Sequence, residues 1–61
     1  MGIAVMKSSV DKDIKDVFIS HGIRRNSRSM LDYEKAKRLI ERYYPDYYEL
    51  GIKVAVEFVG I

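Results

Sequence analysis

The sequence has no cysteine and no tryptophan, and it contains a single proline, a single histidine and four glycines. Without cysteine, the chain cannot form disulfides, iron–sulfur clusters or zinc sites built on thiolates. One histidine also excludes a histidine-rich metal site. The four glycines are scattered along the chain, so no glycine-rich phosphate-binding loop is present. We therefore predict no metal and no cofactor for this protein.

The chain is also short. Its 61 residues correspond to one small domain that spans 1–61. A chain of this size buries only about 60% of its unfolded surface, so its hydrophobic core is marginal. Because disulfides and metals are excluded, the additional stability must come from an unusually well-packed core or from a partner subunit.

Long hydrophobic runs are missing as well. No segment approaches the roughly 18 consecutive apolar residues that a membrane span needs. Residues 1–7 lack both the basic leader and the long apolar stretch of a signal peptide. Hydrophobic residues make up 48% of the chain and charged residues 33%, which is typical of a globular protein. We therefore expect a soluble, cytoplasmic protein without a membrane partner.

The first half of the chain predicts a strand followed by a helix. Residues 2–7 form a short apolar run whose length favours a strand. The four residues from Ser8 to Asp11 match a capping-box pattern and predict that a helix begins there. Gly22 has the place of a left-handed helix stop, with Ile23 as its hydrophobic contact. The apolar face of this helix would consist of Val10, Ile14, Val17, Phe18 and His21.

The second half predicts a helix followed by a strand. Residues 24–28 carry no apolar side chain and are interpreted as an exposed loop. A second capping pattern starts at Ser29, so a helix should begin near Met30 and end before Pro45. Glu34 and Arg38 of this helix have the spacing and order of a favourable ion pair. Residues 52–59 alternate between apolar and mixed positions, which predicts the clearest strand of the chain.

The predicted order of elements is therefore strand, helix, helix, strand. This order indicates a small single-domain α+β fold with antiparallel strands. A two-stranded sheet is marginal alone and exposes two edges. We predict that the strand at 52–59 pairs with another copy, which would give a homodimer with a continuous sheet. The alternative is a monomer whose helices cover both strands.

The residue types that catalyse reactions do not form a convincing group. His21 lies near the end of the first predicted helix without a nucleophile or an orienting carboxylate at a suitable spacing. We interpret it as a favourable polar group at a helix C-terminus. Asp13 and Asp16 alternate with Lys12 and Lys15, which indicates a solvated charged face. We therefore predict no catalytic residues and no enzymatic activity.

Basic residues are concentrated in the middle of the chain. Between Arg24 and Arg42 there are seven basic and three acidic residues, whereas residues 43–61 carry a net charge of −2. Such a segment could follow a phosphate backbone or bind an acidic protein. A helix-turn-helix motif fits badly because the loop is too long, and a ribbon-helix-helix leaves the last strand without a role. The candidate binding residues are Arg24, Arg25, Arg28, Lys35, Arg38 and Arg42.

Four tyrosines surround the single proline, and tyrosine is enriched at protein interfaces. Our leading hypothesis is a small, non-enzymatic interaction module with an accessory or structural role, which self-associates and joins a larger protein assembly. The alternative is a small nucleic-acid-binding protein that uses the basic segment at 24–42. The candidate interface residues are Tyr43, Tyr44, Tyr47, Tyr48, Ile52, Val54, Val56 and Phe58.

Overall fold

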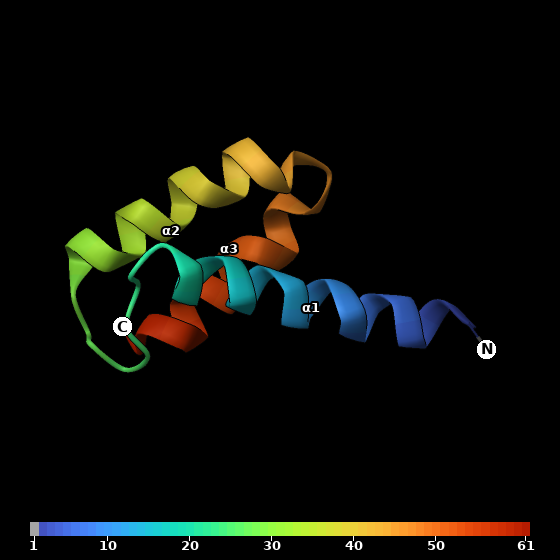
Figure 1. Cartoon of the computed structure of the whole chain (residues 1–61), viewed down its shortest axis with the longest axis horizontal. Helices are drawn as coiled ribbons and strands as arrows, with labels where there is room; N and C mark the ends of the chain where they lie inside the picture. Colours follow the sequence, from blue (N-terminus) through green and yellow to red (C-terminus); the bar gives the residue numbers. More distant parts are fainter. Residues whose placement is uncertain (1) are drawn as a thin grey trace.

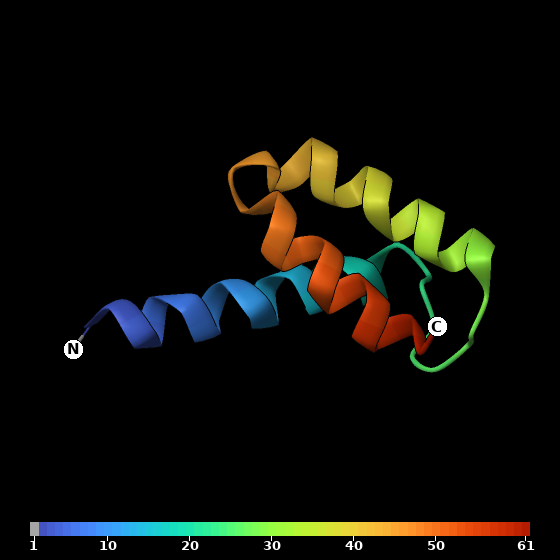
Figure 2. The same cartoon turned by 180° about the vertical axis from the view of Figure 1, so that it is seen from behind.

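The structure is a computed structural model that describes residues 2–61, with side chains described from Ser9 onward. Its elements are α1 (Gly2–Ser20), α2 (Met30–Tyr43), the short 3-10 helix η1 (Pro45–Tyr47) and α3 (Tyr48–Val59). Figure 1 shows α2 and α3 as a helical hairpin that turns at η1, with α1 lying across α3. The view from behind in Figure 2 shows that the beginning of α1 extends past the other two helices.

The predicted α+β fold is wrong, because residues 2–61 contain helices and no strand. The expected first strand, at 2–7, is the beginning of α1, so the capping pattern at Ser8 does not start that helix. The expected last strand, at 52–59, lies within α3. The sheet that was predicted to continue into a second copy is therefore absent from the described part of the chain.

The last segment is a helix because its apolar residues also have helical spacing. Alternation of apolar residues from Ile52 onward suggested a strand, but, counted from Gly51, the buried positions are one, four, five, eight and nine. This spacing places them on one side of a helix. Tertiary packing of that side overrides the strand preference of valine and isoleucine. The buried residues of α3 are Gly51, Val54, Ala55, Phe58 and Val59.

The end of α1 confirms the predicted glycine stop. Gly22 has φ = 83°, in the left-handed region, and its N–H donates to the carbonyl oxygen of Ile19 at 3.1 Å. The N–H of Ile23 donates to the carbonyl oxygen of Phe18 at 3.0 Å. These two bonds form a Schellman motif, and Ile23 is buried as its hydrophobic contact. The motif turns the chain away from α1 at the predicted residue.

The beginning of α2 is also confirmed. Ser29 is its N-cap, and the Ser29 Oγ accepts a hydrogen bond from the Asp32 N–H at 3.3 Å. The Asp32 carboxylate accepts a bond from the Ser27 Oγ at 2.7 Å, and the same Oγ accepts the Ser29 N–H at 3.4 Å. In an ordinary capping box, the side chain of the third helical residue accepts the N–H of the N-cap residue directly. Here the Ser27 Oγ links the Asp32 carboxylate to the Ser29 N–H instead. As predicted, α2 ends before Pro45.

The core lies where the three helices meet. The rings of Phe18 in α1 and Phe58 in α3 make an edge-to-face contact with centroids 5.6 Å apart. The α2 and α3 backbones approach closely at Gly51, where an added Cβ would lie 2.6 Å from the Ile40 Cγ2. The core residues are Ile14, Phe18, Ile23, Ala36, Leu39, Ile40, Val54, Ala55, Phe58 and Val59.

Candidate functional site

The candidate interface residues of the expected last strand do not form an exposed surface. Val54 and Phe58 are each only 3% exposed and belong to the core. Ile52 is half-buried against the core, and Val56 lies on the outer side of α3. Because these four residues point to different sides of a helix, they do not provide the continuous apolar edge that the strand prediction required.

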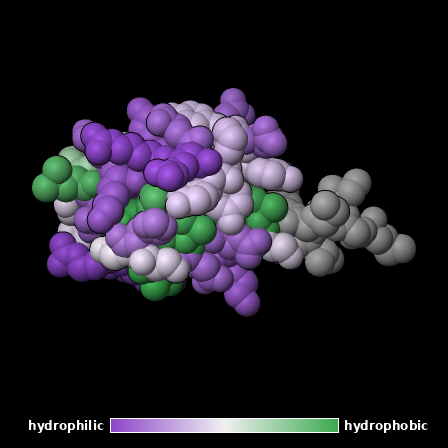
Figure 3. Space-filling model, turned by 45° about the horizontal axis from the view of Figure 1, so that its top comes forward, coloured by the Kyte–Doolittle hydropathy of each residue, from purple (hydrophilic) through white to green (hydrophobic). Residues whose placement is uncertain are grey.

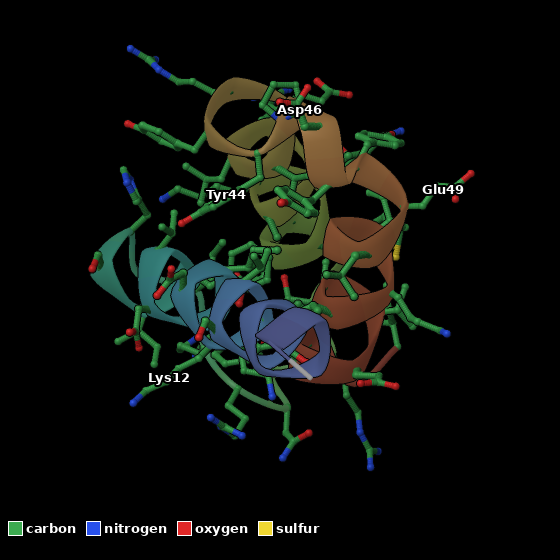
Figure 4. The ribbon with its side chains drawn as sticks, turned by 90° about the vertical axis from the view of Figure 1, so that its right-hand side faces the viewer. Lys12, Tyr44, Asp46 and Glu49 are labelled. Carbon is green, nitrogen blue, oxygen red and sulfur yellow. The ribbon has the colours of Figure 1, made fainter. Side chains whose placement is uncertain are left out.

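The four candidate tyrosines divide into two pairs. Tyr43 ends α2 and is 48% exposed, whereas Tyr44 follows it and is half-buried against the core. Tyr47 in η1 and Tyr48 at the start of α3 are both exposed. Figure 4 shows Tyr44 between the end of α2 and α1, whereas Asp46 and Glu49 point away from it. Tyr43 and Tyr44 therefore lie at the end of α2, whereas Tyr47 and Tyr48 lie at the α2–α3 turn. The acidic residues of that turn, Asp46 and Glu49, point away from Tyr44.

The three candidate arginines of the loop are exposed, and each has a neighbour in the fold. The Arg24 Nε lies 3.8 Å from the Asp32 Oδ2. The Arg25 guanidinium lies 4.9 Å from the centroid of the Phe58 ring, which is a cation–π distance. Arg28 has a left-handed backbone, with φ = 56°. These arginines surround the end of α3 and the beginning of α2, so part of their role is structural.

The three candidate basic residues of α2 are exposed and, unlike Arg24 of the loop, form no ion pair with a described side chain. Lys35, Arg38 and Arg42 follow one another at helical spacing along one side of α2, beside the side that packs against the core. No carboxylate lies within 4.0 Å of any of the three in the part of the chain whose side chains are described. The expected Glu34–Arg38 ion pair is therefore not formed. The three residues form an exposed row without a contacting carboxylate among the described side chains, which we call the basic row.

Two aromatic rings lie between α2 and α1 next to this row. The ring of Tyr43 is 5.9 Å from that of His21, which is exposed at the end of α1. The Arg42 guanidinium lies 5.7 Å from the Tyr43 ring centroid. The contact between His21 and Tyr43 joins residues that are 22 positions apart, and no local pattern in the sequence indicates it.

A pair of carboxylates on α1 lies near Tyr44, which follows Tyr43. Burial raises the pKa of Tyr44 above its ordinary value of 10.0, and the negative charges of Asp13 and Asp16 on α1 raise it further. Both carboxylates are exposed. We define the α1–α2 face as Asp13, Asp16, His21, Lys35, Arg38, Arg42, Tyr43 and Tyr44. It is basic along α2, aromatic in the middle and acidic along α1.

The α1–α2 face combines charged side chains with aromatic rings. The Ser20 Oγ, the hydroxyl nearest in sequence to His21, donates to the Asp16 carbonyl oxygen at 2.9 Å. No group of three metal-binding side chains is present within the described residues. An open hollow of about 260 Å³ lies on α2, but its mixed charges do not converge on one point. Tyr33, Glu34, Lys37, Arg38 and Glu41 line this hollow.

The outer surface of α2 is mainly hydrophilic. In Figure 3, where α2 comes forward, hydrophobic residues form separate small patches among polar ones. The most exposed of the large apolar side chains is Leu31, near the start of α2. No described helix has both the length and the apolar character that crossing a membrane requires. No protein-family model, curated protein or solved structure was found to match the chain.

Proposed function

We propose that this chain is a small, non-catalytic interaction module that self-associates and acts as an accessory protein. The exposed aromatic surface at the end of α2 carries this proposal. Tyr43 keeps 48% of its surface exposed although it already contacts His21 and Arg42. A rigid, half-exposed aromatic ring with a polar tip is the kind of residue that contributes most to binding at protein interfaces.

Size supports self-association. A 61-residue chain has a marginal core, and binding of a second copy stabilises the folded state by mass action. Among the side chains that the structure describes, from Ser9 onward, the core contains ten residues, of which two are alanines. A cytoplasmic location stays a prediction from the sequence, and cell fractionation with an antibody against the chain tests it.

Sedimentation velocity over a range of concentrations tests the proposal. We expect the average mass of the wild-type chain to rise with concentration, and we expect Tyr43→Ser to reduce this rise. Ile61→Ser is the matched control, because Ile61 is 46% exposed and follows the end of α3, away from Tyr43. Circular dichroism of each variant shows whether it keeps its helices. A wild-type chain that stays monomeric up to millimolar concentration contradicts the proposal.

The basic row favours a second candidate function, the binding of nucleic acid. Lys35, Arg38 and Arg42 are exposed, and no carboxylate among the described side chains lies within 4.0 Å of their basic nitrogens. Such residues release counterions from a phosphate backbone, so binding would weaken steeply as salt increases. Fluorescence anisotropy with labelled single-stranded and duplex oligonucleotides, at about 50 mM salt, tests this function. The double variant Lys35→Ala with Arg38→Ala should weaken binding and reduce its salt dependence.

A further inference from the structure

The α1–α2 face has opposite charges on its two helices. Asp13 and Asp16 are exposed on α1, and neither lies within 4.0 Å of a basic nitrogen in the described side chains. The nearby Lys15 instead pairs with Asp11, at 3.5 Å. The face therefore has an unpaired acidic side on α1, opposite the unpaired basic row of α2.

The two charged sides belong to one continuous surface. Tyr44 lies close enough to Asp13 and Asp16 for their negative charges to raise its pKa. Its neighbour Tyr43 lies under the Arg42 guanidinium. Aromatic rings thus occupy the space between the acidic and the basic side. A flat partner that covers the rings would meet both charged sides at once.

The two helices of the face run in opposite directions and lie on the same side of the molecule (Figure 1). Consider a second copy that is turned by 180° about an axis parallel to these helices and placed against the face. This rotation puts α2 of each copy against α1 of the other. Each basic row then meets the partner's acidic side, and the aromatic rings meet in the centre. The symmetric contact is closed, so it gives a dimer and not a chain of copies.

We propose that the α1–α2 face is a self-complementary interface, in which Arg38 and Arg42 of each copy pair with the acidic side of α1 on the other. This inference rests on the self-association that we propose above and specifies its surface and its symmetry. Charge complementarity selects a second copy as the occupant, because the same face supplies both signs. The alternative partner of the basic row, a nucleic acid, would be repelled by Asp13 and Asp16.

The ionic character of this interface predicts how it responds to salt. At 0.1 M salt, interactions between exposed charges are largely screened beyond about 10 Å, and this distance shortens as the salt concentration rises. Interfacial charges of this kind mainly determine the choice of partner and the rate of association. We therefore expect a dimer that dissociates as salt rises, whereas an interface that is mainly hydrophobic would persist.

A charge-swap experiment tests the pairing directly. One variant carries Arg38→Glu and Arg42→Glu, and the other carries Asp13→Lys and Asp16→Lys. Each variant places like charges against each other in its own homodimer, so self-association should weaken about tenfold or more. Mixed one to one, they place opposite charges together at both contacts of the dimer. Sedimentation should then show a heterodimer with an affinity close to that of the wild type.

The matched control is the double variant Glu49→Lys with Glu57→Lys, which changes the charge equally on exposed residues of α3. It should associate like the wild type, and circular dichroism checks that every variant keeps its helices. A wild-type dimer that persists in both reversed variants, or a mixture that does not associate, overturns the pairing and leaves self-association standing. A monomeric wild type overturns both proposals. A monomer whose reversed α2 variant loses oligonucleotide binding assigns the basic row to nucleic acid.

Discussion

The backbone N–H of Asn26, in the loop between α1 and α2, donates to the carbonyl oxygen of Phe58 at 2.8 Å. Two residues further on, the N–H of Arg28 donates to the carbonyl oxygen of Val59, also at 2.8 Å. The last carbonyl groups of a helix have no partner within the helix. The second half of the loop therefore caps α3 and joins the α1–α2 connection to the third helix.

This cap requires an unusual backbone, which leads to a first prediction. Asn26 and Arg28 have φ = 58° and 56°, in the left-handed region. Asparagine tolerates this region, but a residue such as arginine is strained there by roughly 1–2 kcal/mol. Arg28→Gly should relieve the strain, offset in part by the greater flexibility of glycine in the unfolded chain. We expect the free energy of unfolding to rise by about 0.5–1 kcal/mol, measured by urea denaturation.

Arg28→Ala is the control for this prediction, because alanine removes the guanidinium and keeps the strained backbone. Its stability should stay close to that of the wild type. If alanine stabilises the chain as much as glycine does, the arginine side chain and not the backbone is the source of the strain.

Gly51 gives a second prediction, which concerns the contact between α2 and α3. A Cβ at this position would lie 2.6 Å from the Cγ2 and 2.9 Å from the Cγ1 of Ile40. Both atoms are close to the backbone of a buried residue, so they cannot move away freely. Gly51→Ala should lower the free energy of unfolding by about 1–3 kcal/mol, although alanine is the better helix former.

A double-mutant cycle with Ile40→Ala identifies the clash. Ile40→Ala alone should cost about 2–5 kcal/mol, because it leaves a cavity in the core. The two substitutions together should cost clearly less than their sum, since the new methyl group of residue 51 occupies part of that cavity. Strict additivity in chemical denaturation would falsify the close approach of the two helices at this point.

The cap at Ser29 and the glycine stop at Gly22 were predictable from the sequence because they act within a few residues, whereas the capping pattern at Ser8 lies inside α1. Ser29 with Asp32, Gly22 with Ile23, and Pro45 each mark a helix end at the predicted place. The type of the last element was not predictable in this way. Its alternating valines fit a strand, and only the packing of α3 against the other helices selects the helical set of buried positions.

The candidate site shows the same difference between local and distant signals. The spacing of Lys35, Arg38 and Arg42 predicted a row along one helix, and the structure has this row on the outer side of α2. The opposing carboxylates of Asp13 and Asp16 come together with Tyr44 only through the packing of α1 against α2. Because these residues are about 30 positions apart, the sequence alone indicated a solvated charged face.

A third prediction concerns acid. The hydrogen bond from Ser27 holds the pKa of Asp32 below its ordinary value of 3.8; the Arg24 N–H and the charges of Arg24 and Lys35 also lower it, against an opposing effect of burial. A lowered folded-state pKa contributes stability that is present above pH 3.8 and is lost as pH falls through the folded value. Acid should therefore weaken the start of α2.

Ser27→Ala tests this contribution. The variant should be less stable than the wild type at about pH 7, and the difference should shrink at about pH 2, where Asp32 is protonated in both states. Urea denaturation at the two pH values measures it. Asp32→Asn should remove the dependence altogether. A Ser27→Ala deficit of equal size at both pH values would show that the hydroxyl acts through the Ser29 N–H, at 3.4 Å, and not through the carboxylate.

The final prediction concerns alkali and uses Tyr44 to report on the acidic side of the α1–α2 face. Burial is the main cause of its raised pKa, and the charges of Asp13 and Asp16 add to it. Replacing both aspartates with asparagine should therefore lower the pKa of Tyr44 only part of the way to 10.0. Tyrosinate absorbance, compared with that of Tyr44→Phe at a concentration where the chain is monomeric, isolates this residue among the five tyrosines.

The sign of the effect on stability follows from the same shift. A folded-state pKa above 10.0 contributes stability that is present below that pH and is lost as pH rises through the folded value. The paired control is Asp46→Asn with Glu49→Gln, because Figure 4 shows both side chains pointing away from Tyr44. This control should leave the titration of Tyr44 unchanged. If it shifts the titration as much as the α1 variant does, the negative charge near Tyr44 comes from the α2–α3 turn, and the acidic side of the proposed interface has been misplaced.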